Sequence, residues 1–214
     1  MTHFEGRALA CFRGGRLVFQ NLEISLGPGD ATLVTGPNGS GKSTLLRLLA
    51  GLLKAADGTL SFAGKPVSDD IEAHHKRLAY LGHLNAVKAV LTVRENIAVW
   101  VGEAGLPAMT PEEALATFGL MPLAEQPARL LSAGQRRRLA LARLLACGGD
   151  IWLLDEPSVG LDHGSQERLE AAIADHRTAG GRVVLASHTA IDLPEASRLD
   201  LADYQPDSLP ELIW

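Results

Sequence analysis

A glycine-rich stretch that ends in a lysine and two hydroxyl residues carries the clearest chemistry in this sequence. Its residues, in order, are Gly36, Pro37, Asn38, Gly39, Ser40, Gly41, Lys42, Ser43 and Thr44. Glycines let the backbone curl until successive N–H groups point at one anion, and the positive end of a following helix adds to the attraction. At this spacing the Lys42 ammonium reaches the β- and γ-phosphates of a nucleotide, and the Ser43 hydroxyl is a ligand for Mg²⁺. The stretch, called the phosphate loop below, therefore predicts binding of ATP with Mg²⁺ and a catalytic role for Lys42.

The segments on either side of the phosphate loop decide against a chance glycine-rich turn. Residues 31–35 are short and mostly apolar, as in a strand that is buried on both faces. After the loop, leucines at spacings of three and four predict one buried stripe on a helix: Leu45, Leu46, Leu48, Leu49 and Leu52. A strand before the loop and a helix after it are the context that phosphate binding requires.

A second apolar run ends in two carboxylates. Residues 151–154 are apolar, and Asp155 and Glu156 follow them. The carboxyl ends of strands in a parallel sheet face the ligand crevice, so these acids are expected to lie near the phosphate loop. Asp155 is then a candidate ligand for Mg²⁺, and Glu156 can polarise the water that attacks the γ-phosphate. The alternative is an ordinary strand end with solvated acids, which the upstream phosphate loop disfavours.

Strand-like and helix-like segments alternate along most of the chain, which predicts an α/β fold with a mainly parallel sheet. The strand-like segments are residues 7–12, 22–26, 31–35, 59–62, 78–82, 151–154 and 182–186. The first two alternate apolar and polar residues, as half-exposed antiparallel strands do. Helical patterns cover residues 92–119, 133–147 and 163–179, and Thr92 with Glu95 resembles an N-terminal capping box.

The bulk composition limits the classes of partner. The 214 residues carry a formal charge of −5 and only 5% aromatic residues, which argues against a nucleic-acid partner. No apolar run is long enough to span a bilayer, and the N-terminus lacks the apolar core of a signal peptide. The chain is therefore expected in the cytoplasm, with any membrane contact made through a partner protein.

A third segment distinguishes among the many enzymes that use a phosphate loop. Residues 131–135 read Leu-Ser-Ala-Gly-Gln, and a basic helical pattern follows them. This signature segment resembles the LSGGQ signature of ATP-binding-cassette ATPases, with Ala133 in place of one glycine. Residues 157–162 resemble the loop that couples two cassettes in that family, and His188 resembles its switch histidine. The similarity covers nearly the whole chain.

The resemblance implies an architecture and a dimer. The fold would be a single cassette domain over residues 1–214, with a parallel core, an antiparallel β subdomain and an inserted helical subdomain at roughly residues 90–147. Two such cassettes sandwich two ATP molecules, so Ser132, Gly134 and Gln135 would act on the γ-phosphate held by a second copy. His188 would contact the γ-phosphate and stabilise the hydrolytic geometry together with Glu156.

Two positions depart from the family pattern. Cassettes usually carry a glutamine after the strand at residues 78–82, where it touches Mg²⁺ and the membrane partner, and this chain has His83. Cassettes also stack adenine on an aromatic residue early in the chain. Phe12 and Arg13 both compete for that place, because either a ring or a guanidinium plane can stack on a base.

A narrower resemblance concerns residues 11–13, 80–83 and 91–96. Together with the small size and with His83, they are similar to the heme exporter ATP-binding subunit of the cytochrome c maturation system. In that family the ATP-binding subunit lies at the cytoplasmic face of the bacterial inner membrane and pairs with a polytopic permease. The complex supports c-type cytochrome assembly through heme export or release of a heme-bearing chaperone. The alternatives are a transport ATPase for another solute, a soluble cassette ATPase, and a non-catalytic nucleotide-gated scaffold.

Three further features have plainer interpretations. The adjacent pair His74 and His75 is expected in a solvated loop, and Cys11 and Cys147 are expected to be buried small residues rather than heme ligands. The arginine run at residues 136–138 is expected to solvate a helix face beside the ATP interface, since a nucleic-acid role is disfavoured by the net charge.

Overall fold

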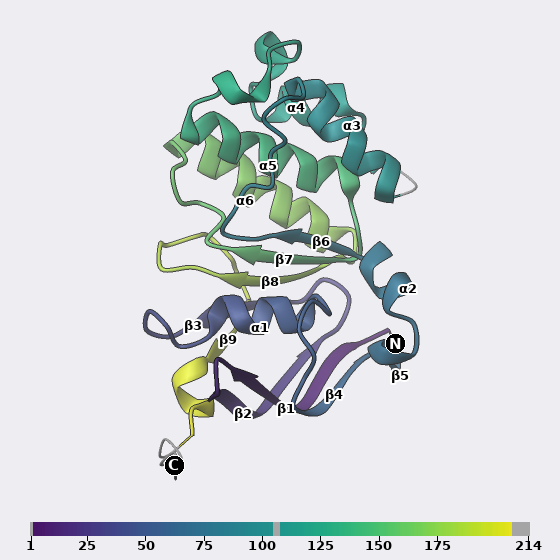
Figure 1. Cartoon of the computed structure of the whole chain (residues 1–214), viewed down its shortest axis with the longest axis vertical. Helices are drawn as coiled ribbons and strands as arrows, with labels where there is room; N and C mark the ends of the chain where they lie inside the picture. The colour runs from purple at the N-terminus through teal and green to yellow at the C-terminus, as the bar shows by residue number, and fades with distance from the viewer. Residues whose placement is uncertain (1, 105–107, 207–214) are drawn as a thin grey trace.

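The computed structural model describes residues 2–104 and 108–206, which form two β-sheets with helices between and above them (Figure 1). The strands are β1 (Phe4–Arg13), β2 (Arg16–Leu26), β3 (Ala31–Thr35), β4 (Asp57–Phe62), β5 (Lys65–Pro66), β6 (Leu78–Leu81), β7 (Ile151–Asp155), β8 (Arg182–Ala186) and β9 (Ser197–Asp200). The α-helices are α1 (Lys42–Leu49), α2 (Ile71–Lys76), α3 (Val93–Ala104), α4 (Pro111–Thr117), α5 (Ala133–Cys147) and α6 (His163–Thr178). Short 3₁₀ turns span Val67–Asp69, Met121–Leu123, Ala128–Leu130 and Leu201–Tyr204.

The larger sheet is parallel and has the strand order β6-β7-β8-β3-β9. Every residue of the central strands β7 and β8 is buried, which explains their continuous apolar runs. The predicted α/β fold with a mainly parallel sheet is confirmed. The edge strand β9 was not predicted, because only one of its four residues is buried and its sequence is largely polar.

The smaller sheet is antiparallel and has the order β2-β1-β4-β5. Strand β2 alternates as expected at residues 22–26, with Leu22, Ile24 and Leu26 buried. The alternation expected for residues 7–12 is wrong. The register of β1 shifts around Ala8 in its pairing with β2 and also in its pairing with β4. Ala8 has a φ of 49°, which marks a bulge, and the three residues that follow it, 9–11, are all buried.

Helix α1 lies between the two sheets, and helices α3 to α6 lie over the opposite face of the parallel sheet (Figure 1). The apolar stripe of α1 is buried from Leu45 to Leu49, as predicted. Leu52 does not belong to it: the helix ends at Leu49, and the Leu52 side chain is 55% exposed. Within residues 2–104 and 108–206, no helix combines the length and apolar character needed to cross a bilayer.

The chain between β6 and β7 forms the upper helical layer. The single helical pattern read over residues 92–119 corresponds to two helices, α3 and α4, which both pack against α5. The predicted capping box at Thr92 is confirmed, since Thr92 N donates to Glu95 Oε2 at 2.8 Å and Glu95 N donates to Thr92 Oγ1 at 3.1 Å. Helix α5 occupies the predicted residues 133–147.

The interpretation of His74 as part of a solvated loop is wrong. His74 lies in α2, is fully buried and stacks on the Phe4 ring with centroids 5.8 Å apart. Its Nε2 lies 2.9 Å from the Leu49 carbonyl oxygen, so Nε2–H donates to the last turn of α1, while the buried Nδ1 has no partner. A second proton would place an unpaired charge at Nδ1, and burial accordingly lowers the pKa of His74 below its ordinary value of 6.5. Helix α2 escaped prediction because it is only six residues long.

The lowered pKa of His74 predicts a loss of stability in mild acid. The unfolded chain binds a proton at this histidine first, so its contribution is present above about pH 6.5 and is lost as the pH falls toward the folded-state value. We expect His74→Gln, which keeps an N–H donor for Leu49, to reduce the drop in free energy of unfolding between about pH 7.5 and 5.5. Urea denaturation at the two pH values measures this. His176, whose pKa is also lowered by burial, is present in both proteins and cancels. Equal pH dependence of the two proteins would contradict the assignment.

Candidate functional site

The carboxyl ends of β3, β6, β7 and β8 meet at one edge of the parallel sheet because the strands run in the same direction. A cavity of about 910 Å³ opens there, and we call it the nucleotide cavity. Its walls come from the β1–β2 hairpin, the phosphate loop and the residues that follow the three other strands. The predicted site residues that line it are Arg13, Asn38, Gly39, Ser40, Gly41, Lys42, Ser43, Thr44, His83, Asp155, Glu156 and His188.

The phosphate loop has the tight backbone that its glycines predict. Gly41 has a φ of 107°, and a Cβ at this position would lie 2.4 Å from Val18 Cγ1, so only glycine fits between the loop and β2. The helix that follows has no acidic residue in its first turn, which leaves its positive end free for an anion. The Ser40 hydroxyl is buried without a hydrogen-bond partner.

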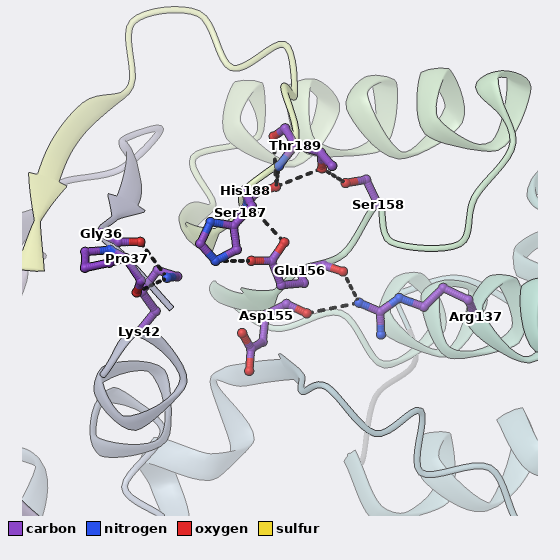
Figure 2. Close-up of polar contacts among 10 residues, drawn as sticks. All are labelled: Gly36, Pro37, Lys42, Arg137, Asp155, Glu156, Ser158, Ser187, His188 and Thr189. Atoms are coloured by element: carbon purple, nitrogen blue, oxygen red, sulfur yellow. Dashed lines mark hydrogen bonds and ion pairs between the residues drawn. The ribbon is translucent and has the colours of Figure 1, made fainter. Parts of the chain in front are cut away.

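The Lys42 side chain folds back over the loop and is 7% exposed. Its Nζ donates to the carbonyl oxygens of Gly36 at 2.8 Å and of Pro37 at 3.0 Å (Figure 2). An ammonium has three N–H groups, so one remains for a phosphate oxygen. Gly36 and Pro37 thus contribute by orienting the lysine.

The acidic strand end faces the loop across the cavity. Asp155 is 2% exposed at the end of β7, and the Glu156 side chain is 16% exposed. His188 N donates to Glu156 Oε2 at 3.1 Å, and His188 Nε2 lies 3.6 Å from Glu156 Oε1 (Figure 2). His188 after β8 and Glu156 after β7 therefore form a pair. The backbone N–H of His188 contacts one oxygen of the Glu156 carboxylate, and its ring contacts the other.

Three buried oxygens in this cavity have no hydrogen-bond partner: Ser40 Oγ, Asp155 Oδ2 and Glu156 Oε1. Buried polar atoms without hydrogen-bond partners are rare in folded proteins, and inside a cavity a bound ion or ligand is one explanation for them. A carboxylate oxygen at Asp155 suits a hard cation such as Mg²⁺, and Ser43 on the facing helix supplies a hydroxyl oxygen. The residues present therefore fit Mg²⁺ together with a nucleotide phosphate.

The signature segment lies elsewhere. Among the described residues that line the nucleotide cavity, none comes from residues 131–135. Ser132 caps α5: Ser132 N donates to Gln135 Oε1 at 2.8 Å, and Gln135 N donates to Ser132 Oγ at 3.2 Å. A Cβ on Gly134 would lie 3.2 Å from the Gly160 carbonyl oxygen, so this glycine packs beside the loop at residues 157–162.

The two candidates for adenine stacking are placed differently. Arg13 lines the nucleotide cavity, and its Nη1 donates to Thr44 Oγ1 at 3.4 Å. Phe12 is 58% exposed and is not among the described residues that line the cavity. The two alternate in direction because neighbouring strand residues point to opposite faces.

Sequence reasoning missed two groups of contacts at this site. The first is Arg137, which was expected to be solvated and is instead 5% exposed beside the acidic strand end. The second is a hydroxyl bridge between the loops after β7 and β8, where Ser158 Oγ and Thr189 Oγ1 lie 2.6 Å apart (Figure 2). No periodic pattern marks either of them. The adjacency of Ser158 to Glu156 is the one signal that could have drawn attention to the bridge.

The family model for the ABC transporter matches residues 19–159, which is more than half of the 214 residues. The chain belongs to the ABC transporter family. The matched segment holds the phosphate loop, the signature segment and the acidic strand end, and this cassette is accordingly an ATP-hydrolysing transport ATPase that binds ATP.

Two curated relatives are similar to the cassette over most of its length. The cytochrome c biogenesis ATP-binding export protein CcmA of Rhodospirillum rubrum is 52% identical, covering 95% of this chain and 88% of the relative. The protein of the same name from Paramagnetospirillum magneticum is 50% identical, covering 94% of each.

Solved structures show the same fold. A putative ABC transporter ATP-binding protein from Pyrococcus furiosus superposes with a TM-score of 0.81 at 24% identity, covering 95% of this chain and 100% of that one. The ADP conformation of an ATP-binding cassette of an ABC transporter superposes with a TM-score of 0.70 at 25% identity, covering 89% and 82%.

The position of Arg13 predicts that it, and not Phe12, contacts the base. We expect Arg13→Ala to raise the Kd for ATP by roughly fivefold, because a guanidinium stacked at an exposed site contributes up to about 1 kcal/mol. Phe12→Ala is the matched control on the neighbouring residue and should leave the Kd within about twofold of the parent. Fluorescence titration of the purified chain with a labelled ATP measures both. Weaker binding by the Phe12 variant alone would reverse the assignment.

Proposed function

We propose that this chain is the ATP-hydrolysing subunit of an ABC exporter that energises c-type cytochrome biogenesis. The observation that carries its ATPase part is the convergence of Lys42, Asp155, Glu156 and His188 on one cavity, where three buried oxygens lack a hydrogen-bond partner. The assignment to cytochrome c biogenesis is supported by the names of the relatives that are 52% and 50% identical.

Each group around the cavity has a role that its position favours. Lys42 and the phosphate-loop N–H groups bind the phosphates, and Glu156 accepts a proton from the attacking water. His188 orients Glu156 and contacts the γ-phosphate. Ser43 and Asp155 would hold Mg²⁺, which neutralises charge on the phosphate oxygens when it is bound.

The complete site requires a second copy of the chain. Ser132, Gly134 and Gln135 lie outside the cavity of their own chain, at the exposed start of α5. A helix N-terminus with a serine and free N–H groups suits a phosphate anion. We therefore assign these residues to the nucleotide of a partner cassette in an ATP-sandwich dimer, with residues 1–214 acting as one cassette and residues 90–147 as its helical subdomain.

The membrane permease is assigned to a second cavity, of about 690 Å³. Two leucines that line it are exposed to solvent, Leu52 by 55% and Leu84 by 81%. Arg47 and Arg143 line it as well, so a short segment with apolar side chains and a carboxylate fits its chemistry. His83 lines this second cavity and the nucleotide cavity, so a segment seated here lies next to the ATP site.

This arrangement supports a peripheral location at the cytoplasmic face of the bacterial inner membrane. The cassette contacts the bilayer only through the permease, and the net charge of −5 argues against a nucleic-acid partner. We place the cargo in contact with the permease rather than with the cassette.

Replacing the proposed base separates ATP binding from hydrolysis. We expect Glu156→Gln to lower kcat by about 100-fold or more, because a general base contributes at least that factor, while ATP binding persists. The variant should also accumulate as a dimer with ATP and Mg²⁺. Steady-state hydrolysis, nucleotide titration and light scattering measure the three effects. Near-normal turnover would show that Glu156 is not the base.

The dimer in that experiment has its own control. Adding Ser132→Arg to the Glu156→Gln protein places a bulky cation where the partner's nucleotide must approach. The double variant should bind ATP and stay monomeric. A stable ATP-bound dimer of the double variant would refute the role of the signature segment.

The second cavity predicts where a single charge disrupts the transporter. Leu84→Glu adds a carboxylate to an exposed apolar wall, so we expect the chain to lose co-purification with the permease and the cells to lose most of their c-type cytochrome. Val90→Glu is the matched control, since Val90 is 82% exposed and is not among the described lining residues. Detergent co-purification and heme staining measure both. Normal complex formation by the Leu84 variant would place the permease elsewhere.

A further inference from the structure

Arg137 is the middle residue of the run at 136–138 and differs from its neighbours. Arg136 is exposed and Arg138 is half-buried, whereas Arg137 is 5% exposed. It lies in the early part of α5, and its side chain reaches toward the end of β7 (Figure 2). A charged side chain this deep requires hydrogen-bond partners for its whole donor set.

The guanidinium meets that requirement with oxygen atoms from two distant segments. It has five N–H groups, and five oxygens accept from it. Nε donates to Pro157 O at 3.1 Å, and Nη1 donates to Gly82 O at 3.2 Å and to Asn85 Oδ1 at 3.0 Å. Nη2 donates to Asp155 O at 3.0 Å and to Glu156 O at 2.5 Å. One planar fork on α5 therefore joins residues 82–85 to residues 155–157.

The contact at Glu156 explains an unusual backbone. Glu156 has a φ of 49°, the left-handed region that side-chain-bearing residues rarely adopt. Such a conformation persists only where the surroundings hold it. Here Glu156 N donates to Ala186 O at 2.8 Å on one side, and Arg137 binds the carbonyl oxygens around it on the other. Arg137 thus helps to hold the backbone from which the Glu156 carboxylate projects.

The contacts at Gly82 and Asn85 bracket His83. His83 lines both the nucleotide cavity and the second cavity, and it has no regular secondary structure to hold it after β6 ends at Leu81. The two contacts fix the loop on both sides of His83. The same helix carries the signature segment at its N-terminus.

We propose that Arg137 is a positioning residue that holds the His83 loop and the Glu156 backbone in one fixed relation to the signature helix. Arg137 is not among the described residues that line the nucleotide cavity, and it acts by placing two residues that are. The proposal deepens the proposed function and rests on Glu156 and His83 working at the nucleotide. A purely structural role would stabilise the fold without linking the two loops, so the test must report on the loops themselves.

Amide hydrogen exchange of the nucleotide-free chain reports directly on the two loops. Arg137→Gln keeps two N–H donors of the five, so we expect amides at residues 82–88 and 155–161 to exchange at least roughly tenfold faster, both together. Arg137→Lys keeps the charge but not the fork and should show the same pattern. Full protection with lysine would show that the charge alone suffices and would overturn the proposal, as would faster exchange in only one of the two segments.

Two further variants keep the outcome interpretable. Asn85→Ala deletes one acceptor without stranding a buried charge, and it should loosen the same two segments to a smaller degree. Asn85→Ala still tests the proposal if the Arg137 variants fail to fold. Arg182→Gln is the matched control: Arg182 is 3% exposed and donates to Leu26 O at 3.3 Å and to Thr2, at the opposite end of the sheet. It should lower Tm and leave exchange at both segments unchanged. If Arg182→Gln sped exchange at both segments as much as the Arg137 variants do, the effect of those variants would be general destabilisation.

Hydrolysis then tests the consequence for catalysis. We expect Arg137→Gln to lower kcat by roughly 100-fold with the Kd for ATP nearly unchanged, because misplacing a catalytic group by about 1 Å has that effect. Arg182→Gln should retain the kcat of the parent. Faster exchange in both segments with an unchanged kcat would overturn the catalytic consequence. Faster exchange in only one segment would overturn the proposed link between the two loops. A parent chain without ATPase activity would instead refute the proposed function, which the exchange experiment does not require.

Discussion

Parallel pairing of β6, β7, β8, β3 and β9 is the constraint on which the rest of this structure depends. Parallel strands end on the same side, so every loop that leaves a carboxyl end is delivered to one edge. The phosphate loop, the acid pair and His188 come from three different strands and reach one cavity for this reason. The antiparallel sheet adds the remaining wall, because Val18 on β2 packs against Gly41 with no room for a side chain.

The same edge leaves the site open on one side. The signature segment closes its own capping box and stays out of the cavity of its own chain. By contrast, oxygens at Ser40, Asp155 and Glu156 are buried in the cavity without a hydrogen-bond partner. This asymmetry supports the proposal that a second copy contributes its signature segment to the site. His83 lines both the nucleotide cavity and the second cavity, which is where the proposed permease contact would affect the site.

Sequence reasoning succeeded at several elements that one local pattern defines. The strands β3 and β8 and the helix α5 have the predicted bounds, since buried apolar runs and a capping serine define them. It failed at Arg137 and His74, because a charged or polar residue type taken by itself predicts exposure to solvent. Each is buried because a distant segment supplies partners: carbonyl oxygens after β6 and β7 for Arg137, and the end of α1 for His74. No periodicity in the chain encodes such a pairing.

The sequence by itself determined the chemical inventory: a phosphate loop, an acid pair, a signature segment and a histidine in an unusual position. It also determined the parallel sheet, because continuous apolar strands alternate with helices. Only the tertiary structure decided that Arg13 faces the cavity while Phe12 points away, and that Arg137 gathers two loops around Glu156. The physical reason is that residue type and spacing specify what a side chain can do. Which partners it meets depends on the packing of segments far apart in the chain.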